Sequence, residues 1–93
     1  MTAIPADAQS RETIRISNQS GVTLFYFHAT DTRYSTFGED LLGSRVLNPG
    51  QFWDLTFSNV TNCIYDFRLI YENGRVEEDY GVNICAGGTY TLR

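Results

Sequence analysis

Hydrophobic and polar side chains alternate at every second position along most of this 93-residue chain. Between Glu12 and Asn18, for example, Ile14 and Ile16 share one side and polar residues occupy the positions between them. A period of two is typical of a half-buried β-strand, whereas a helix repeats about every 3.6 residues. The predicted strands are Glu12–Asn18, Val22–Ala29, Trp53–Phe57, Cys63–Tyr71, Arg75–Cys85 and Thr89–Arg93. The pattern therefore predicts an all-β fold, either a small antiparallel β-sandwich or a partly open barrel.

Two short motifs predict tight turns between these strands. Asn48-Pro49-Gly50 combines a proline that fixes φ with a glycine that accepts a positive φ. Asn73-Gly74 lies between two strands and predicts a two-residue type I′ hairpin turn. The hairpin pairs would then be Glu72 with Arg75, Tyr71 with Val76, Leu69 with Glu78, Arg68 with Asp79 and Phe67 with Tyr80. This register points Glu78 inward, which we interpret as a charge that protects an edge strand rather than as a catalytic carboxylate.

The chain has two cysteines, Cys63 and Cys85, with neither a CxxC pair nor a histidine cluster beside them. They are therefore buried thiols or one disulfide rather than a metal site. A one-residue bulge at Gly81 would bring Cys63 opposite Cys85, because it shifts the hairpin register by one position. We accordingly predict a cross-strand disulfide between them.

Length and composition limit the chain to one domain. A chain of this size with 42% hydrophobic residues supports a single small core, which we assign to residues 10–93. Residues 1–9 contain Ala6-Asp7-Ala8, which fits the end of a secretory signal peptide cleaved before Gln9. An ordinary disordered N-terminus is the alternative. With the paired cysteines, the first interpretation indicates an exported protein, periplasmic or extracellular.

The charge balance narrows the possible partners. The formal charge is −4 and the chain has no lysine, so a nucleic-acid partner is not expected. Anionic membrane surfaces are disfavoured for the same reason. No stretch reaches the roughly 18 apolar residues of a membrane span, so we expect no membrane insertion. We also expect a monomer.

Three segments, GEDLLGSRVLNPGQFW, CIYDFRLIYENGRVEEDYGVNIC and ISNQSGVTLFYFHAT, together resemble a family of small exported bacterial β-domains of unassigned function. Family members share an aromatic-Gly-acidic-acidic-Leu-Leu-Gly run, a Pro-Gly turn, a Cys-x-Tyr-Asp strand and a Gly-Val-Asn-x-Cys strand. The match covers most of residues 12–92, and Phe37 stands where the family pattern has Trp. The resemblance implies export and paired cysteines, and it supplies no activity.

Enzyme chemistry has little support in the sequence. A serine or cysteine hydrolase needs a base held beside its nucleophile. His28 is the only histidine, and Ser35 and Asp31 are only loosely related to it in sequence. We interpret His28 as a half-exposed strand residue and expect the chain not to be an enzyme.

The sequence indicates two candidate binding sites instead of an active site. If Phe25 and Phe27 pack inward beside Trp53, strand alternation turns Leu24, Tyr26 and His28 outward as a candidate binding face. Its partner would be an unknown protein, peptide or envelope component, and the competing interpretation is a central strand buried on both sides.

The other candidate lies in the polar stretch that follows this strand. Asp31, Glu39 and Asp40 could bind calcium through carboxylate oxygens, although no DxDxD-type run is present. We favour a crossover loop without a cofactor, in which Phe37, Leu41 and Leu42 close one end of the core.

Overall fold

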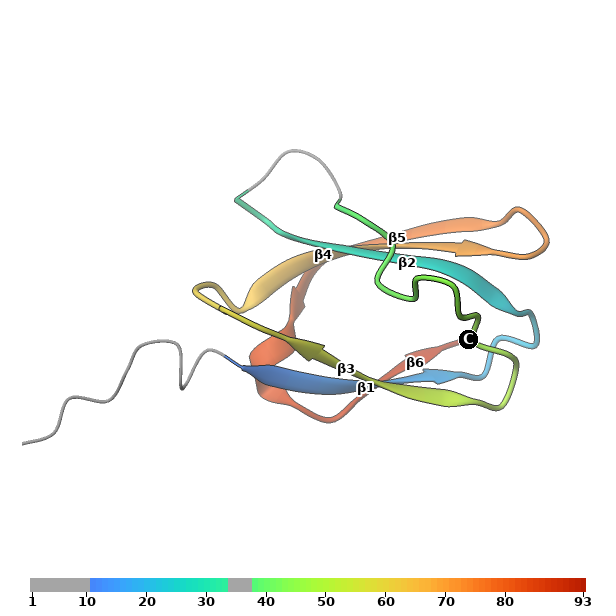
Figure 1. Cartoon of the computed structure of the whole chain (residues 1–93), viewed down its shortest axis with the longest axis horizontal. Coiled ribbons are helices and arrows are strands. Elements are labelled where there is room, and N and C mark those ends of the chain that lie inside the picture. The colour runs from blue at the N-terminus through green and yellow to red at the C-terminus, as the bar shows by residue number, and fades with distance from the viewer. Residues whose placement is uncertain (1–10, 34–37) are drawn as a thin grey trace, which may run out of the picture.

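Two three-stranded sheets pack face to face in the computed structural model, which describes residues 11–33 and 38–93 (Figure 1). The strands are β1 (Glu12–Asn18), β2 (Leu24–Asp31), β3 (Phe52–Phe57), β4 (Ile64–Tyr71), β5 (Val76–Asn83) and β6 (Thr89–Leu92), with a short 3-10 helix, η2 (Ile84–Ala86), before β6. The strand orders are β3-β1-β6 and β2-β4-β5. The predicted all-β sandwich is confirmed, and the sheets do not close into a barrel. One pair, β1 with β6, is parallel, whereas the other neighbours are antiparallel.

The core lies between the inner faces of the two sheets, where alternate residues of each strand meet. Phe27 is fully buried, and its ring lies 5.6 Å from that of Trp53 and 4.9 Å from that of Phe67. Of the two phenylalanines expected to pack inward beside Trp53, Phe27 does so, whereas Phe25 is only half-buried. The buried hydrophobic residues are Ile14, Ile16, Leu24, Phe27, Leu42, Leu47, Leu55, Phe57, Phe67, Leu69, Tyr71, Ile84 and Leu92.

A buried asparagine joins the turn after β1 to the segment before β3. The Asn18 side chain donates hydrogen bonds to the carbonyls of Val22 (2.9 Å) and Leu47 (2.8 Å). Its Oδ1 accepts one from the backbone N–H of Ser20 at 3.0 Å. Because each polar atom has a partner, this fully buried amide stabilises two connections at once.

The hairpin between β4 and β5 differs from the predicted type I′ turn. The N–H of Tyr71 donates to the carbonyl of Arg75, and the N–H of Gly74 donates to the carbonyl of Tyr71, both at 2.9 Å. The loop therefore has three residues and ends at Gly74, whose φ of 87° fits a type I turn followed by a glycine bulge. The predicted pairs are wrong by one position: Leu69 lies opposite Glu77, Arg68 opposite Glu78 and Phe67 opposite Asp79. The inward positions of β5 thus belong to Glu77 and Asp79, and not to Glu78.

The predicted bulge and disulfide are both confirmed at the other end of this hairpin, but Cys63 does not lie opposite Cys85: it precedes β4 and bonds to Ile84, and Cys85 lies in η2. Tyr65 lies opposite Val82 although Phe67 lies opposite Asp79, so β5 carries one extra residue near Gly81. Gly81 has φ = 74° and donates its N–H to a carboxylate oxygen of Asp66 at 3.0 Å. Beyond the bulge, Cys63 and Cys85 form a disulfide with their Cα atoms 5.4 Å apart.

The disulfide should account for a large share of the stability. It links cysteines 22 residues apart, and closing a loop of this length stabilises a fold by about 3 kcal/mol in the chain-entropy model. We expect the double variant Cys63→Ser/Cys85→Ser to unfold at a clearly lower urea concentration than the oxidised protein. Coincident unfolding curves would contradict this role.

Candidate functional site

Strand β2 carries the three residues expected to form a binding face, and the structure separates them. Leu24 lies opposite Tyr71 and Tyr26 lies opposite Ile70, so Phe25 is an extra residue that breaks the alternation. Leu24 is fully buried, whereas the side chain of Tyr26 is 45% exposed and His28 is half-buried. The expectation of an exposed residue among the three is confirmed for Tyr26. The placement of Leu24 on that face is wrong, because the bulge turns it into the core.

His28 is hydrogen-bonded to the segment of residues 38–40, which lies beside β2. The Nδ1 atom of His28 lies 2.8 Å from the carbonyl oxygen of Gly38, and its ring stacks on that of Tyr26 with centroids 6.5 Å apart. His28 also forms an antiparallel bridge with Asp40. The segment from Gly38 to Asp40 thus runs along the outer edge of β2.

The carboxylate of Asp40 joins this segment to the strand. Its Oδ1 accepts hydrogen bonds from the backbone N–H groups of Phe27 (2.9 Å) and Leu42 (3.0 Å). The N–H of Leu41 donates to the carbonyl of Phe27 at 2.8 Å. Leu42 is buried and Leu41 is half-buried, as predicted for a segment that closes the core, while Phe37 lies outside the described residues. Asp40 therefore has a structural role.

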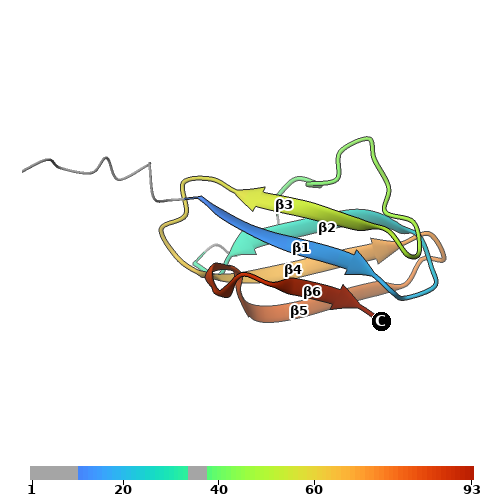
Figure 2. The same cartoon turned by 90° about the horizontal axis from the view of Figure 1, so that it is seen from below.

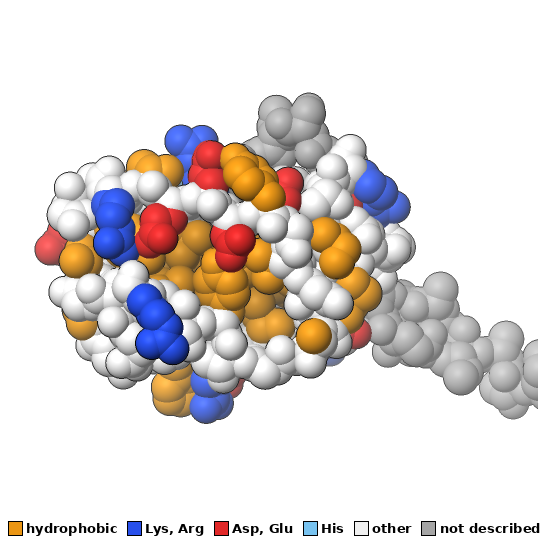
Figure 3. Space-filling view, turned by 180° about the vertical axis from the view of Figure 1, so that it is seen from behind, with side chains coloured by type: hydrophobic (Ala, Val, Ile, Leu, Met, Phe, Trp, Pro, Cys, Tyr) orange, Lys and Arg blue, Asp and Glu red, His pale blue; other side chains and the backbone are white. Residues whose placement is uncertain are grey.

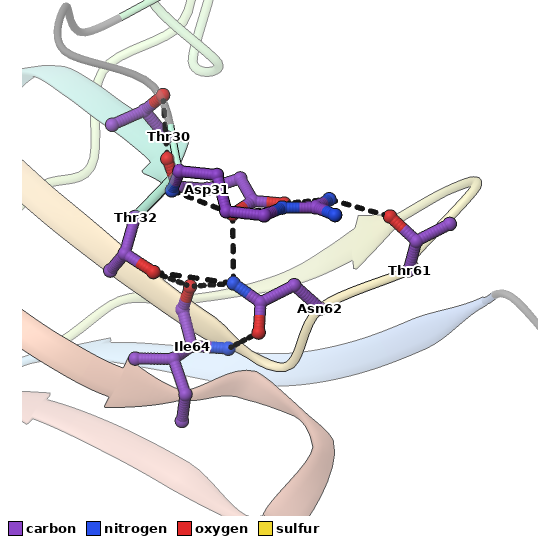
Figure 4. A network of polar contacts seen from close by, with 7 residues as sticks. Thr30, Asp31, Thr32, Thr61, Asn62 and Ile64 are labelled. Atoms are coloured by element: carbon purple, nitrogen blue, oxygen red, sulfur yellow. Dashed lines mark hydrogen bonds and ion pairs between the residues drawn. The ribbon is translucent and has the colours of Figure 1, made fainter.

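Asp31 is the centre of a polar network at the far end of β2 (Figure 4). Its carboxylate accepts hydrogen bonds from Nε of Arg33 at 3.0 Å and from the side-chain amide of Asn62 at 2.8 Å. Arg33 also donates to the hydroxyl of Thr61, so the network ties β2 to the loop before β4. The hydrogen bonds from Arg33 hold the pKa of the Asp31 carboxyl well below its usual range.

The structure does not bring the three calcium candidates together. Asp40 lies opposite His28, and Asp31 is three residues further along β2, a distance of about 10 Å. Calcium needs its oxygen ligands within about 2.6 Å of the ion, so the three carboxylates would have to lie close together. No group of three or more metal-binding side chains occurs in the described part of the chain, and Glu39 is exposed. The geometry therefore gives no support to a calcium site.

Two adjoining hollows flank the loop formed by residues 43–46, close to Tyr26. The larger is a groove of about 560 Å³, and the smaller has about 250 Å³. The groove is lined by Leu42, Arg45, Val46, Leu47, Gly50, Gln51, Phe52 and Trp53, and the smaller hollow by Phe25, Tyr26, Gly43, Ser44, Arg45 and Val46. Arg45 and Val46 border both, and the guanidinium carbon of Arg45 lies 5.9 Å from the ring centre of Trp53. The groove has the size typical of ligand-binding pockets.

Exposed apolar side chains gather around these hollows. Tyr26, Val46 and Phe52 are 45%, 44% and 57% exposed, and each lines one or both hollows. We call this the Tyr26–Val46–Phe52 surface. The two further large hydrophobics exposed in the described ranges, Val76 and Tyr80, both lie on β5.

Of the three residues of this surface, only Tyr26 is predicted from the sequence. A signal was present, because Val46-Leu47 and Phe52-Trp53 are pairs of consecutive apolar residues. Neighbouring residues of an extended chain point to opposite sides, so one member of each pair must face outward. Leu47 is buried and Trp53 half-buried, which leaves Val46 and Phe52 exposed.

The comparisons with known proteins add no assignment. Neither models of protein families nor curated proteins match the sequence, and no solved structure matches the fold. The resemblance to exported β-domains therefore stays a prediction. Among the described residues, no helix has the length and apolar character needed to cross a bilayer.

The Asp31 network should make stability depend on pH. The carboxyl has a lower pKa in the folded chain than its unfolded value of about 3.9, so its contribution is complete above that pH and is lost as the pH falls. Between about pH 6 and pH 2, the unfolding free energy of Asp31→Asn should therefore fall less than that of the wild type. The matched control is Glu39→Gln, an exposed residue, which should keep the wild-type dependence. Equal slopes for Asp31→Asn and wild type would disprove the role of this network.

Because Asp40 accepts two backbone hydrogen bonds, we expect its replacement by alanine to destabilise the fold more than its replacement by asparagine. Asp40→Ala leaves the N–H groups of Phe27 and Leu42 without this acceptor and should destabilise the fold by about 1–3 kcal/mol. Asp40→Asn keeps a carbonyl oxygen in the same place and should cost clearly less. Thermal unfolding of both variants checks the order. A calcium-dependent rise in melting temperature, abolished in Asp40→Asn, would instead indicate an ion site.

Proposed function

We propose that this chain is a non-enzymatic interaction module that is exported to the periplasm or the extracellular space. It binds a protein, peptide or envelope component through the Tyr26–Val46–Phe52 surface. The observation that carries this proposal is the gathering of three exposed apolar side chains around two adjoining hollows. Exposed apolar patches of this kind mark interaction sites in soluble domains.

The residue types and the rigidity of the surface support this proposal. Tyrosine, tryptophan and arginine are the types that most often dominate binding energy, and Tyr26, Trp53 and Arg45 border the hollows. Leu47 and Leu24 exchange backbone hydrogen bonds of 2.9 and 3.0 Å, which fix the loop against β2. A surface ordered in advance loses less conformational entropy on binding.

The lining of the groove favours a partner of mixed apolar and polar chemistry. Leu42, Leu47 and Trp53 favour an aliphatic or aromatic side chain of the partner, whereas Arg45 and Gln51 supply hydrogen-bond donors at its border. We therefore infer a partner that inserts an apolar side chain and presents a carbonyl or carboxylate to Arg45.

Other features support the proposed compartment and the proposed non-catalytic role. A disulfide in so small a domain is compatible with an oxidising environment. The single histidine uses a ring nitrogen to hold a backbone carbonyl, a structural arrangement, which supports binding rather than catalysis.

Capture from an envelope extract tests this function. Immobilised wild-type protein should retain a specific partner, and both Tyr26→Ser and Phe52→Ser should lower its recovery by about tenfold, since truncating a central aromatic removes a dominant contact. The matched control is Tyr80→Ser, which removes an exposed tyrosine of β5 outside the two hollows. Circular dichroism would check that each variant folds. Equal recovery by all four proteins would contradict the proposal.

A further inference from the structure

The sandwich is open along the side where β5 and β6 are the outermost strands (Figure 2). This is the side opposite β2 and β3, where the Tyr26–Val46–Phe52 surface lies. Seen from behind, hydrophobic side chains of the interior are visible there, between acidic and basic residues (Figure 3). This opening is independent of the surface described above.

A small hollow lies in this opening. It has a volume of about 80 Å³, and its lining combines apolar and aromatic side chains with three acidic residues and one basic residue: Leu69, Tyr71, Tyr90, Leu92, Glu77, Glu78, Asp79 and Arg93, together with Thr91. Pockets for free small molecules measure roughly 300–1,000 Å³, so the hollow is too small for a metabolite. It has room for the end of one side chain.

The hydroxyl of Tyr71 lacks a partner in this hollow. Tyr71 is only 1% exposed, and within the described residues no hydrogen bond of good geometry reaches its oxygen, although the side chains of Arg75 and Glu77 lie close enough to influence the hydroxyl. Burial raises the pKa of this hydroxyl, so it stays protonated at neutral pH. A buried polar group without a partner is costly and rare in folded proteins. Because Tyr71 lines the hollow, its oxygen is available to a donor or acceptor that enters there.

The charges around the hollow favour a cation. Glu77, Glu78 and Asp79 are consecutive on β5, and Glu77 and Asp79 face inward. Glu77 is paired with Arg75 at 2.9 Å and Glu78 with Arg68 at 3.7 Å. Asp79 instead accepts a hydrogen bond of 2.5 Å from the neutral hydroxyl of Tyr90. Among the described residues no ion pair reaches Asp79, so of the three acidic residues it is the one whose charge is available to a further cationic group.

The backbone of β5 can receive a further strand. In the described chain β5 has β4 as its only neighbour in the sheet. Hydrogen-bonded positions alternate along an antiparallel pair, and Tyr71 is bonded to Arg75, so the backbone groups of Val76 and Glu78 point away from β4. A second copy of this chain is a poor occupant, because antiparallel self-pairing would place acidic residues beside one another.

We propose that the edge of β5 binds an extended, basic segment of a partner protein by strand addition. One arginine or lysine side chain of this segment enters the hollow, where it donates hydrogen bonds to Asp79 and to the oxygen of Tyr71. The neighbouring residues of the segment pair with the backbone of Val76 and Glu78.

A peptide titration tests this site directly. The probe is a capped peptide as long as β5 in which arginine alternates with threonine. It should bind the full chain, perturb the NMR amide signals of β5, and lose affinity in Asp79→Asn by about tenfold or more, because a charge-assisted hydrogen bond is lost. Tyr71→Phe removes only the hydroxyl, and should weaken binding about three- to tenfold without lowering the melting temperature.

Controls separate this site from general attraction to an acidic chain. Glu72→Gln removes the same charge from the exposed hairpin loop and should leave the affinity within about twofold. A matched peptide with N-methyl groups on its backbone amides should not bind, because it cannot pair with a strand edge. Equal losses in Asp79→Asn and Glu72→Gln, unchanged binding by Tyr71→Phe, or equal binding of the methylated peptide would each overturn the proposal.

Discussion

The structure depends on one constraint: each of its two sheets has only three strands and therefore a large share of unpaired edges. Only β1 and β4 have a neighbour on each side, so the other four strands each present an outer edge. Exposed edges carry unpaired backbone groups and invite association with other chains. The edge of β2 is covered within the chain, by the Asp40 segment and by Leu47. On the other side the described residues leave β5 and β6 uncovered, and the two sides of the sandwich consequently differ in what they can bind.

The sequence was sufficient to predict those parts of the fold for which the physical signal is strong and local. Alternation identified the strands, Gly81 indicated the bulge in β5, and the number and spacing of the cysteines indicated the disulfide. The turn after β4 was harder, because Asn73-Gly74 suits both a two-residue type I′ turn and a three-residue loop that ends in a glycine bulge. The three-residue loop shifts every β4–β5 pair by one residue relative to the type I′ turn. As a result, the inward acidic positions of β5 are Glu77 and Asp79 instead of Glu78.

The candidate site was only partly predictable, because its contacts join residues distant in sequence. No sequence pattern marks the bulge at Phe25, which buries Leu24 and leaves Tyr26 exposed. The carboxylate of Asp40 looked like a possible metal ligand, yet it accepts from the N–H of Phe27, thirteen residues earlier. Such a role depends on where the crossover segment lies against β2, and residue type alone does not determine that. The sequence signal for this surface was the occurrence of two consecutive apolar residues, in Val46-Leu47 and in Phe52-Trp53.

The disulfide between Cys63 and Cys85 also has a topological consequence for the β4–β5 hairpin. The hairpin loop joins the two strands at one end and the disulfide joins them at the other, so both strands belong to a single covalent ring. Strand β5 then cannot peel away from β4 and exchange into another molecule, a hazard for edge strands in small sheets. A proteolytic cut in the exposed loop around Asn73 would leave both halves attached. An oxidising environment would thus keep the acidic edge in place under conditions that open other small domains.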